Sequence, residues 1–551
     1  MKININSIPF SRYGSYFVIS DFDEGLLLRD VHGGDESPSE LFRLSFDEEV
    51  VLDCDETKLT IHKKTDRNAK VEFIYPTDST VHIKTSGLAL KLDAEKVRYD
   101  SFNSMEKNNY EYISYKKETK YHLEVLSGEM AVDAPWRTVG NDYISLELAA
   151  DSELYLTNYR VIYELVKPQP FEEAHAVVQK EYQEWLSNMP ETQPEYQQPH
   201  NLAAYLLWTN TVQADGLLKL PITYMSKNWM QNIWSWDNCF NALLMAERYP
   251  ELAYNQLKIF NLYQDESGAY PDFINDKYVS YNCVKPPIHA WAYQKMIAIN
   301  AQFGEESYLA EMYDSFSQNT HFWLKYRSHD GLPYYTHGND SGWDNASIFH
   351  EGFPITAPDL TAYLIRQMDI LAEFADKLRK HDEATEWRQH ADELYERFLP
   401  TFFDGKQLRA FHTFTGEKVT SSSSAILFLP IVLVYRMETE MKEQLISELL
   451  TRFECKYGIA TEEPTSPLFT GDGYWLGPVW APETYIFVDA LEAAGYSEEA
   501  LRVAKKFCDA TLIGGLAENF NAHTGEGNDD LAFSWTSSVF LLLNNMCMKG
   551  D

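Results

Sequence analysis

Several familiar catalytic signatures are missing from this sequence of 551 residues. It contains no HExxH motif, no Walker phosphate loop, no GxGxxG turn after a strand and no GxSxG elbow. These motifs position a metal ion, a nucleotide or a nucleophilic serine. Metal-hydrolase, nucleotide-binding and serine-hydrolase chemistry therefore lack support, and we expect no cofactor.

Cysteine, positive charge and long apolar runs are also scarce. The six cysteines show neither CxxC nor metal-ligand spacing, as is typical of buried thiols in a reducing compartment. A net charge of −36 argues against nucleic acid as a partner. The longest apolar run, at 425–435, contains Pro430 and is too short to span a membrane. Since the N-terminus also lacks the apolar region of a secretory signal, the sequence predicts a cytoplasmic protein without a membrane partner.

Aromatic residues, in contrast, make up 14% of the chain. Flat rings stack on sugar faces in carbohydrate clefts, but they also fill large cores, so their abundance alone decides nothing.

Residues 1–165 alternate apolar and polar side chains, for example in KLTIH, KVEFIY and TVHIK. This period of two predicts an antiparallel β-sandwich, which we interpret as an accessory domain. A helical stretch at 171–186 and the segment SNMPETQPEYQQPH follow. Their composition predicts a linker helix and a Pro/Gln-rich linker over 166–199.

Residues 200–551 change to a helical period of 3.6. Twelve helices are predicted near 200–213, 237–249, 251–264, 287–302, 306–328, 357–380, 382–399, 420–436, 440–452, 482–495, 498–511 and 531–547. Twelve helices in consecutive pairs predict a mainly α chain whose catalytic domain is an (α/α)6 barrel, with six inner and six outer helices. An α-solenoid is the competing architecture, but the sequence shows no repeated period.

Five long polar and aromatic loops join these helices, at 221–237, 265–287, 329–356, 461–482 and 514–531. Loops at one end of such a barrel converge on its axis, so we expect them to form the functional site.

The loop HGNDSGWDNASIFHEGF, residues 337–353, contains the first candidate catalytic residue. Asp344 follows Trp343 and lies near Gly338 and Gly342. Hydrolysis of a glycosidic bond needs one carboxylic acid that protonates the leaving oxygen and one carboxylate that activates water or attacks. An aromatic wall can raise the pKa of the acid by desolvation. The spacing alone favours an Asx-turn or a helix N-cap.

The loop GLAENFNAHTGEGNDD contains the second candidate, Glu518. A solvated loop carboxylate is the alternative interpretation, and Glu526, Asp529 and Asp530 are rivals in the same loop.

Five motifs together resemble glycoside hydrolase family 63 and the related family 37 trehalases. They are IWSWDNCFNALLM (233–245), KPPIHAWAY (285–293), SGWDNAS, YWLGPVWAPETYI (474–486) and ENFNAHTGEG. They occur in the family's order over about residues 224–540, which makes the match specific. The resemblance implies the (α/α)6 barrel and a glycosidase.

The resemblance makes Asp344 the general acid and Glu518 the general base of an inverting enzyme. Inversion requires a water molecule between the base and the anomeric carbon, so the carboxyl groups should lie about 6.5–9.5 Å apart. Because 174 positions separate the two residues (518 − 344), only closure of the barrel can bring them together.

The same resemblance implies the residues that bind the substrate. These are Trp236, Asp237, Lys285, Trp343, Tyr474, Trp475 and Trp480. Asp237 would accept hydrogen bonds from sugar hydroxyls and the tryptophans would wall the subsite. The alternatives are that Asp237 caps a helix and that Trp480 belongs to the core. Lys285 departs from the family's usual glutamine, and it either contacts an anionic substrate group or offsets the nearby Asp272 and Asp276.

We therefore expect an inverting α-glycosidase acting on a small α-linked glucoside, an oligosaccharide or a glycosylglycerate-like substrate. A sugar epimerase or isomerase that uses His289, His337 and His350 is one alternative, and a non-catalytic sugar-binding paralogue is another. The sugar, the linkage, the oligomeric state and the role of the β domain stay open. A structural calcium ion also stays open, although no EF-hand spacing is present.

Overall fold

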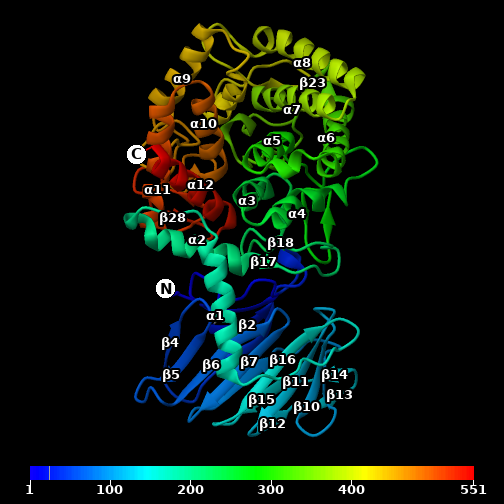
Figure 1. Cartoon of the computed structure of the whole chain (residues 1–551), viewed down its shortest axis with the longest axis vertical. Helices are drawn as coiled ribbons and strands as arrows, with labels where there is room; N and C mark the ends of the chain where they lie inside the picture. Colours follow the sequence, from blue (N-terminus) through cyan, green and yellow to red (C-terminus); the bar gives the residue numbers. More distant parts are fainter. Residues whose placement is uncertain (24, 551) are drawn as a thin grey trace. The chain divides into compact units, whose positions relative to one another are not determined.

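The computed structural model describes residues 1–23 and 25–550 (Figure 1). The chain divides into two compact units, and each consists of several segments. The β unit contains Met1–Met189, Ala204–Asn232 and Asn275–Tyr278. The helical unit contains Pro190–Ala203, Ile233–Ile274 and Val279–Asp551.

Two antiparallel sheets form the β unit. The first sheet has the strand order β1 (Phe17–Phe22), β2 (Gly25–Asp30), β3 (Glu40–Ser45), β8 (Leu90–Ala94), β15 (Ile144–Leu148) and β12 (Met130–Asp133). The second has the order β4 (Val50–Cys54), β5 (Leu59–Lys63), β6 (Lys70–Thr77), β7 (Thr80–Ser86), β16 (Glu153–Tyr159), β11 (Thr119–Ser127), β10 (Asn109–Ser114) and β9 (Ser101–Ser104). A short hairpin, β13 (Trp136–Arg137) and β14 (Gly140–Asn141), lies outside both sheets.

Alternating side chains of these strands meet between the two sheets. In β11, for example, Tyr121, Leu123 and Val125 are buried while the residues between them are partly exposed. The ring of Tyr121 lies 6.0 Å from that of Phe17 in the other sheet. This packing follows from the period of two and confirms the predicted antiparallel β region.

The helix α1 (Phe171–Ser187) belongs to the β unit, because Phe171 and Ala174 pack on Ile74 of β6. Ion pairs hold the two later segments, Ala204–Asn232 and Asn275–Tyr278, to the rest of this unit. Arg160 forms ion pairs of 2.6 Å with both Asp215 and Asp276. The compact units are therefore interleaved in sequence. The division into 1–165, 166–199 and 200–551 stays a prediction.

Eleven of the twelve helices predicted beyond residue 200 are α-helices. They are α2 (Gln197–Asn210), α3 (Asp237–Met245), α4 (Pro250–Asn261), α5 (His289–Ile299), α6 (Glu306–Tyr326), α7 (Pro358–Lys377), α8 (His381–Phe402), α9 (Thr439–Phe453), α10 (Ala481–Ala493), α11 (Ser497–Gly514) and α12 (Ser534–Gly550). The twelfth is the 3₁₀ helix η6 (Ala425–Leu433). Pro430 lies inside η6 and has no N–H for an α-helical hydrogen bond.

Six of these helices close into a ring. In order of contact they are α3, α5, α7, η6, α10 and α12, and α12 packs against α3 again. Outside the ring, α4 packs on α3, α8 on α7, and α11 on both α10 and α12 (Figure 1). The predicted (α/α)6 barrel is confirmed, and the α-solenoid is wrong because the ends of the array meet. The description as mainly α fits the helical unit only, since two large sheets form the other unit.

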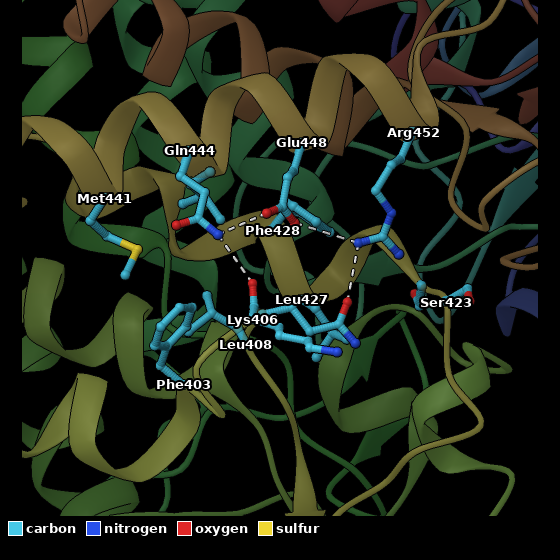
Figure 2. A pocket seen from close by; sticks show the side chains of 13 residues that line it. Phe403, Lys406, Leu408, Ser423, Leu427, Phe428, Met441, Gln444, Glu448 and Arg452 are labelled. Carbon is cyan, nitrogen blue, oxygen red and sulfur yellow. Dashed lines mark hydrogen bonds and ion pairs between the residues drawn. The ribbon is translucent and has the colours of Figure 1, made fainter.

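The outer helix α9 is tied to residues 403–408 by side-chain hydrogen bonds (Figure 2). Gln444 donates to the carbonyl oxygen of Lys406 at 3.1 Å, and Arg452 donates to Gln407 at 3.2 Å. The hollow between them encloses about 20 Å³. That is room for one water molecule and no larger ligand.

Between residues 1 and 550, Glu24 aside, no helix combines the length and apolar character needed to cross a membrane.

Candidate active site

Four of the five long loops, at 265–287, 329–356, 461–482 and 514–531, meet through side-chain contacts. Asn339 donates to Asp272 at 2.8 Å, which joins the acid-containing loop to the loop at 265–287. Asn345 in the same loop accepts from the backbone N–H of Trp475 at 2.9 Å and donates to the carbonyl oxygen of Gly473 at 3.0 Å. The hydroxyl of Tyr474 donates a hydrogen bond to Glu518 of the last loop. The predicted convergence therefore holds for these four loops.

A buried aspartate fixes the backbone that precedes Asp344. The carboxyl group of Asp340, in the 3₁₀ turn η4 (Gly338–Ser341), accepts a hydrogen bond from Arg327 at 2.6 Å and one from the N–H of Thr336 at 2.9 Å. Its other oxygen accepts from the N–H of Val284 at 3.1 Å. Such a fully bonded carboxylate makes the loop rigid.

Two glycines of this loop allow contacts that any side chain would prevent. A Cβ atom at Gly338 would lie 1.7 Å from the carbonyl oxygen of Asp344. At Gly342, where φ is +74°, a Cβ atom would lie 2.4 Å from the ring of Trp236. Because Gly342 has no side chain, the loop packs directly on Trp236. Because Gly338 has none, the backbone of Asp344 can lie against it.

Asp344 is largely shielded from water. Burial raises the pKa of its carboxyl group, and the charge of Asp272 adds to this effect, while the charges of Lys285 and His337 oppose it. A raised pKa keeps a carboxyl group protonated closer to neutral pH, as a general acid requires.

Lys285 is buried and its donors are directed at protein groups. Its Nζ lies 3.1 Å from Asp272 and donates to the carbonyl oxygen of Asn339 at 2.9 Å and to the side-chain oxygen of Asn339. Burial lowers the pKa of Lys285, but the charges of Asp272, Asp344 and Asp237 outweigh it and raise that pKa. Lys285 thus offsets Asp272, whereas Asp276 pairs with Arg160.

A small three-stranded sheet positions Glu518. β26 (Val479–Trp480) pairs with β27 (Asn519–Phe520), and β27 pairs with β28 (Gly527–Asn528). Glu518 directly precedes β27, and its N–H donates to the carbonyl oxygen of Asp530 at 2.7 Å. The hydroxyl of Tyr474 donates to its Oε1 at 3.2 Å.

The pKa of Glu518 is well above its usual range. Burial is the main cause, and the charges of Asp529 and Asp530 add to it, while the hydrogen bond from Tyr474 opposes it. Among the rival carboxylates, Glu526 and Asp529 are exposed. Asp530 is buried and accepts from the N–H of Ala532 at 3.0 Å.

Tyr474 bonds to Glu518 and also responds to the charge of Asp344. Burial raises its pKa well above the usual range, and the charges of Glu518 and Asp344 raise it further. Its backbone has φ of +61°, a conformation that non-glycine residues rarely adopt. The neighbouring contacts of Asn345 hold Tyr474 in this conformation.

Five tryptophan side chains pack together behind these groups. Trp475 stacks on Trp480 at 4.0 Å and on Trp343 at 4.8 Å, and its ring centroid is 6.4 Å from that of Trp236. Trp535 of α12 contacts both Trp236 and Trp480. None of the five is more than 5% exposed. The rings therefore form a buried wall, in which Trp480 serves the core as well as the site.

Asp237 is the first residue of α3 but caps nothing. The N-cap position is occupied by Trp236, and no side chain caps the helix. Burial raises the pKa of Asp237 to about 7, and the charges of Asp272 and Asp344 oppose its ionisation further. Its buried Oδ2 has no hydrogen-bond partner. A buried polar atom without a partner is suited to a ligand that supplies one.

The histidines of the epimerase alternative do not form an acid–base pair. Burial lowers the pKa of His289 to about 4, and its Nε2 bonds to the carbonyl oxygen of Ser235 at 3.0 Å. His337 accepts from the N–H of Asn339 at 3.1 Å and so caps η4. His350 is exposed. In residues 1–23 and 25–550, no three or more Asp, Glu, His or Cys side chains are grouped to hold a metal ion.

Asp272, Asp340 and Asn345 are site residues that the sequence motifs did not assign. Asp340 and Asn345 lie within the quoted loop, four residues before and one after Asp344. Their importance is in hydrogen bonds to distant segments, which a local spacing does not reveal.

The sequence profile of the mannosylglycerate hydrolase MGH1-like glycoside hydrolase domain matches residues 230–536, more than half of the chain. The chain belongs to this family. The match spans all the proposed site residues, and it confirms the resemblance to glycoside hydrolase family 63 and the expectation of a glycoside hydrolase domain.

The relatives of this chain are distant in sequence. The mannosylglycerate hydrolase MGH1 of Selaginella moellendorffii is 27% identical over 208 residues, which are 36% of this chain and 41% of that protein. The match therefore spans less than half the length of this curated relative.

Two solved structures share the fold. The family 63 mannosylglycerate hydrolase of Thermus thermophilus, in complex with glucose, has a TM-score of 0.55 and 17% identity, covering 63% of this chain and 99% of that one. A bacterial glucoamylase complexed with acarbose has a TM-score of 0.63 and 10% identity, covering 100% of this chain and 94% of that one. The second match includes the β unit.

Replacing Gly342 by alanine should destabilise the MGH1-like domain, because the new Cβ would meet the ring of Trp236. Gly352→Ala is the matched control, since Gly352 also has positive φ (+106°) but has nothing within 4 Å of its Cβ position. Denaturant unfolding should show Gly342→Ala to be less stable than Gly352→Ala by about 1–3 kcal/mol, the usual cost of overpacking. Equal stability of the two variants would contradict the proposed packing of the loop on Trp236.

Proposed function

We propose that this protein is an inverting α-glycosidase in which Asp344 is the general acid and Glu518 the general base. The observation that carries the proposal is the pair of largely shielded carboxyl groups on converging loops, both with raised pKa and both raising the pKa of Tyr474 by their charge. Two carboxyl groups on opposite sides of a scissile bond are the machinery of glycoside hydrolysis.

In the proposed reaction, protonated Asp344 donates its proton to the glycosidic oxygen as the bond from this oxygen to the anomeric carbon breaks. A water molecule attacks the anomeric carbon from the opposite face, and ionised Glu518 accepts the proton that this water loses. The products are the free sugar with inverted configuration and the released alcohol. Tyr474 donates to Glu518 and so orients the base.

Glu518 has to be ionised to act, although burial raises its pKa. A raised pKa strengthens the base once it is ionised, but shifts the onset of activity to higher pH. Asp344, in contrast, has to be protonated. We therefore expect activity to rise with pH as Glu518 loses its proton and to fall again as Asp344 loses its own.

The subsite that holds the sugar is proposed to contain Asp237 and the tryptophan wall. Oδ2 of Asp237, which has no partner in the protein, would accept a hydrogen bond from a sugar hydroxyl. Edges of Trp236, Trp343 and Trp475 would limit the subsite, since these rings largely cover one another. Lys285 would act by holding Asp272 and Asn339 in place rather than by contacting the substrate.

The proposed substrate is a small α-linked glucoside or oligosaccharide, or a glycosylglycerate. Family membership and the name of the Selaginella relative support the last of these. A hydrolysis screen over mannosylglycerate, glucosylglycerate, and α-glucosyl and α-mannosyl disaccharides would identify it.

Asp344→Asn and Glu518→Gln should each reduce kcat by roughly 10²–10⁴-fold on the best substrate of the screen, because each removes one proton-transfer group. Glu526→Gln is the matched control: it neutralises an exposed carboxylate of the same loop and should keep wild-type kcat. Binding of the substrate, measured calorimetrically, should persist in both catalytic variants. Wild-type turnover by either variant would refute its assignment, and no hydrolysis by the wild-type protein would favour the non-catalytic alternative.

Lys285→Met should move the limb of the pH–activity profile that Asp344 sets to higher pH. The positive charge of Lys285 lowers the pKa of Asp344, so its removal raises that pKa and keeps the acid protonated to higher pH. Lys258→Met, which breaks the surface ion pair with Glu311 on α6, should leave the limb in place. If neither limb moves to higher pH in Lys285→Met, Asp344 is not a group that sets the profile.

A further inference from the structure

A hollow of about 660 Å³ opens on the β unit, beside the β1–β2 hairpin. We call it the hairpin cavity. Its lining includes two aromatic rings, three carboxyl groups and one guanidinium: Phe22, Trp229, Asp21, Asp23, Glu40 and Arg29. All of them belong to the β unit, and none belongs to the candidate active site. Its volume is within the usual range of small-ligand pockets, about 300–1,000 Å³.

Trp229 is exposed although the chain around it is firmly held. Its side chain is 51% exposed, whereas Lys227 and Asn228, directly before it, are at most 3% exposed. The N–H of Ser226 donates to the carbonyl oxygen of Met230 at 2.9 Å and closes a tight turn around these residues. A large aromatic ring that a rigid turn keeps in solvent is typical of a recognition surface.

Hydrogen bonds from Arg29 hold this turn in place. The buried guanidinium donates to the carbonyl oxygen of Lys227 at 2.9 Å and to that of Asn228 at 2.5 Å. It also lies over the ring of Phe22, 5.2 Å from the centroid. The register between β2 and β3 shifts between Leu28 and Arg29, and such irregularities commonly redirect side chains beside binding sites.

The two aromatic rings form an angled wall next to acceptor groups. The ring centroids of Phe22 and Trp229 are 6.1 Å apart, and their planes meet at 48°. Asp21, the residue before Phe22, is partly buried, and burial raises its pKa. Sugars suit such a lining, because their C–H faces stack on aromatic rings while their hydroxyls donate to carboxylates. With three carboxyl groups and one guanidinium the lining is acidic, which opposes an anionic ligand and suits one that donates hydrogen bonds.

We propose that the hairpin cavity is a second carbohydrate-binding site, in which Trp229 stacks on a neutral sugar whose hydroxyls donate to Asp21, Asp23 and Glu40. This site would hold a sugar without hydrolysing it. It gives the β unit a role that is independent of the proposed chemistry of Asp344 and Glu518.

The test uses the full-length chain with the Glu518→Gln substitution, so that no probe is consumed. Maltotriose and α-1,2-mannobiose are titrated calorimetrically and by tryptophan fluorescence. We expect a binding event that weakens roughly tenfold or more on adding Trp229→Ala, as for an aromatic hot spot. Trp229→Phe should retain part of it. The control is Trp136→Ala, another exposed tryptophan of the same unit, which should leave the binding unchanged.

Three outcomes would overturn the proposal. One is identical titration of the Trp229→Ala and Trp136→Ala proteins. Another is the absence of any Trp229-dependent binding of either sugar up to about 10 mM, weaker than the micromolar-to-millimolar range of ordinary sites. The third is Trp229-dependent binding of spermidine but not of the sugars, which would assign a cation site. Hydrolysis by the wild-type chain is measured separately, so failure of this proposal leaves the glycosidase proposal untouched.

Discussion

Removal of two carboxyl groups from water is the constraint on which the rest of the site depends. An isolated buried carboxylate is costly, so the protein compensates it with hydrogen bonds and with nearby charge. Asp340 is neutralised by Arg327, and Asp272 by Lys285. Asp344 and Glu518 are compensated less completely, and their pKa values are raised. The incomplete compensation is what makes these two carboxyl groups suitable for moving protons.

The barrel makes this arrangement possible, because its closed ring of inner helices brings together loops that are far apart in sequence. Local contacts between the loops then complete the geometry of the site. Asn345 bonds to both Gly473 and Trp475, the β26–β28 sheet sets the position of Glu518, and Gly342 lets the acid loop reach Trp236. Each of these contacts connects two loops. Loss of one contact would therefore disturb both catalytic groups.

Much of the fold follows from the sequence, because its signals are periodic. The alternation over residues 1–165 predicts the two sheets, and the 3.6-residue period predicts eleven α-helices within a few residues. η6 is the exception, since periodicity does not distinguish an α-helix from a 3₁₀ helix around Pro430. The interleaved units were also not predictable, because the ion pairs of Arg160 with Asp215 and Asp276 join residues far apart in sequence.

The candidate site, like the fold, is only partly predictable from the sequence. Its motifs indicate the two carboxylates and the tryptophans, since their residue types and order are recorded in the sequence. The partner of Lys285, the hydrogen bond from Tyr474 and the unpartnered oxygen of Asp237 depend on tertiary contacts and appear only in the structure. The hairpin cavity has no sequence signature, because Phe22 and Trp229 are separated by about two hundred residues.

The central claim is that Asp344 and Glu518 act on opposite faces of the sugar with water between them. Proton NMR of the reducing sugar, recorded within the first turnovers on an α-linked substrate, tests this claim most directly. The account predicts that the β-anomer appears first and that the α-anomer follows by mutarotation. Initial release of the α-anomer would mean retention of configuration, and it would contradict the proposed roles of both residues.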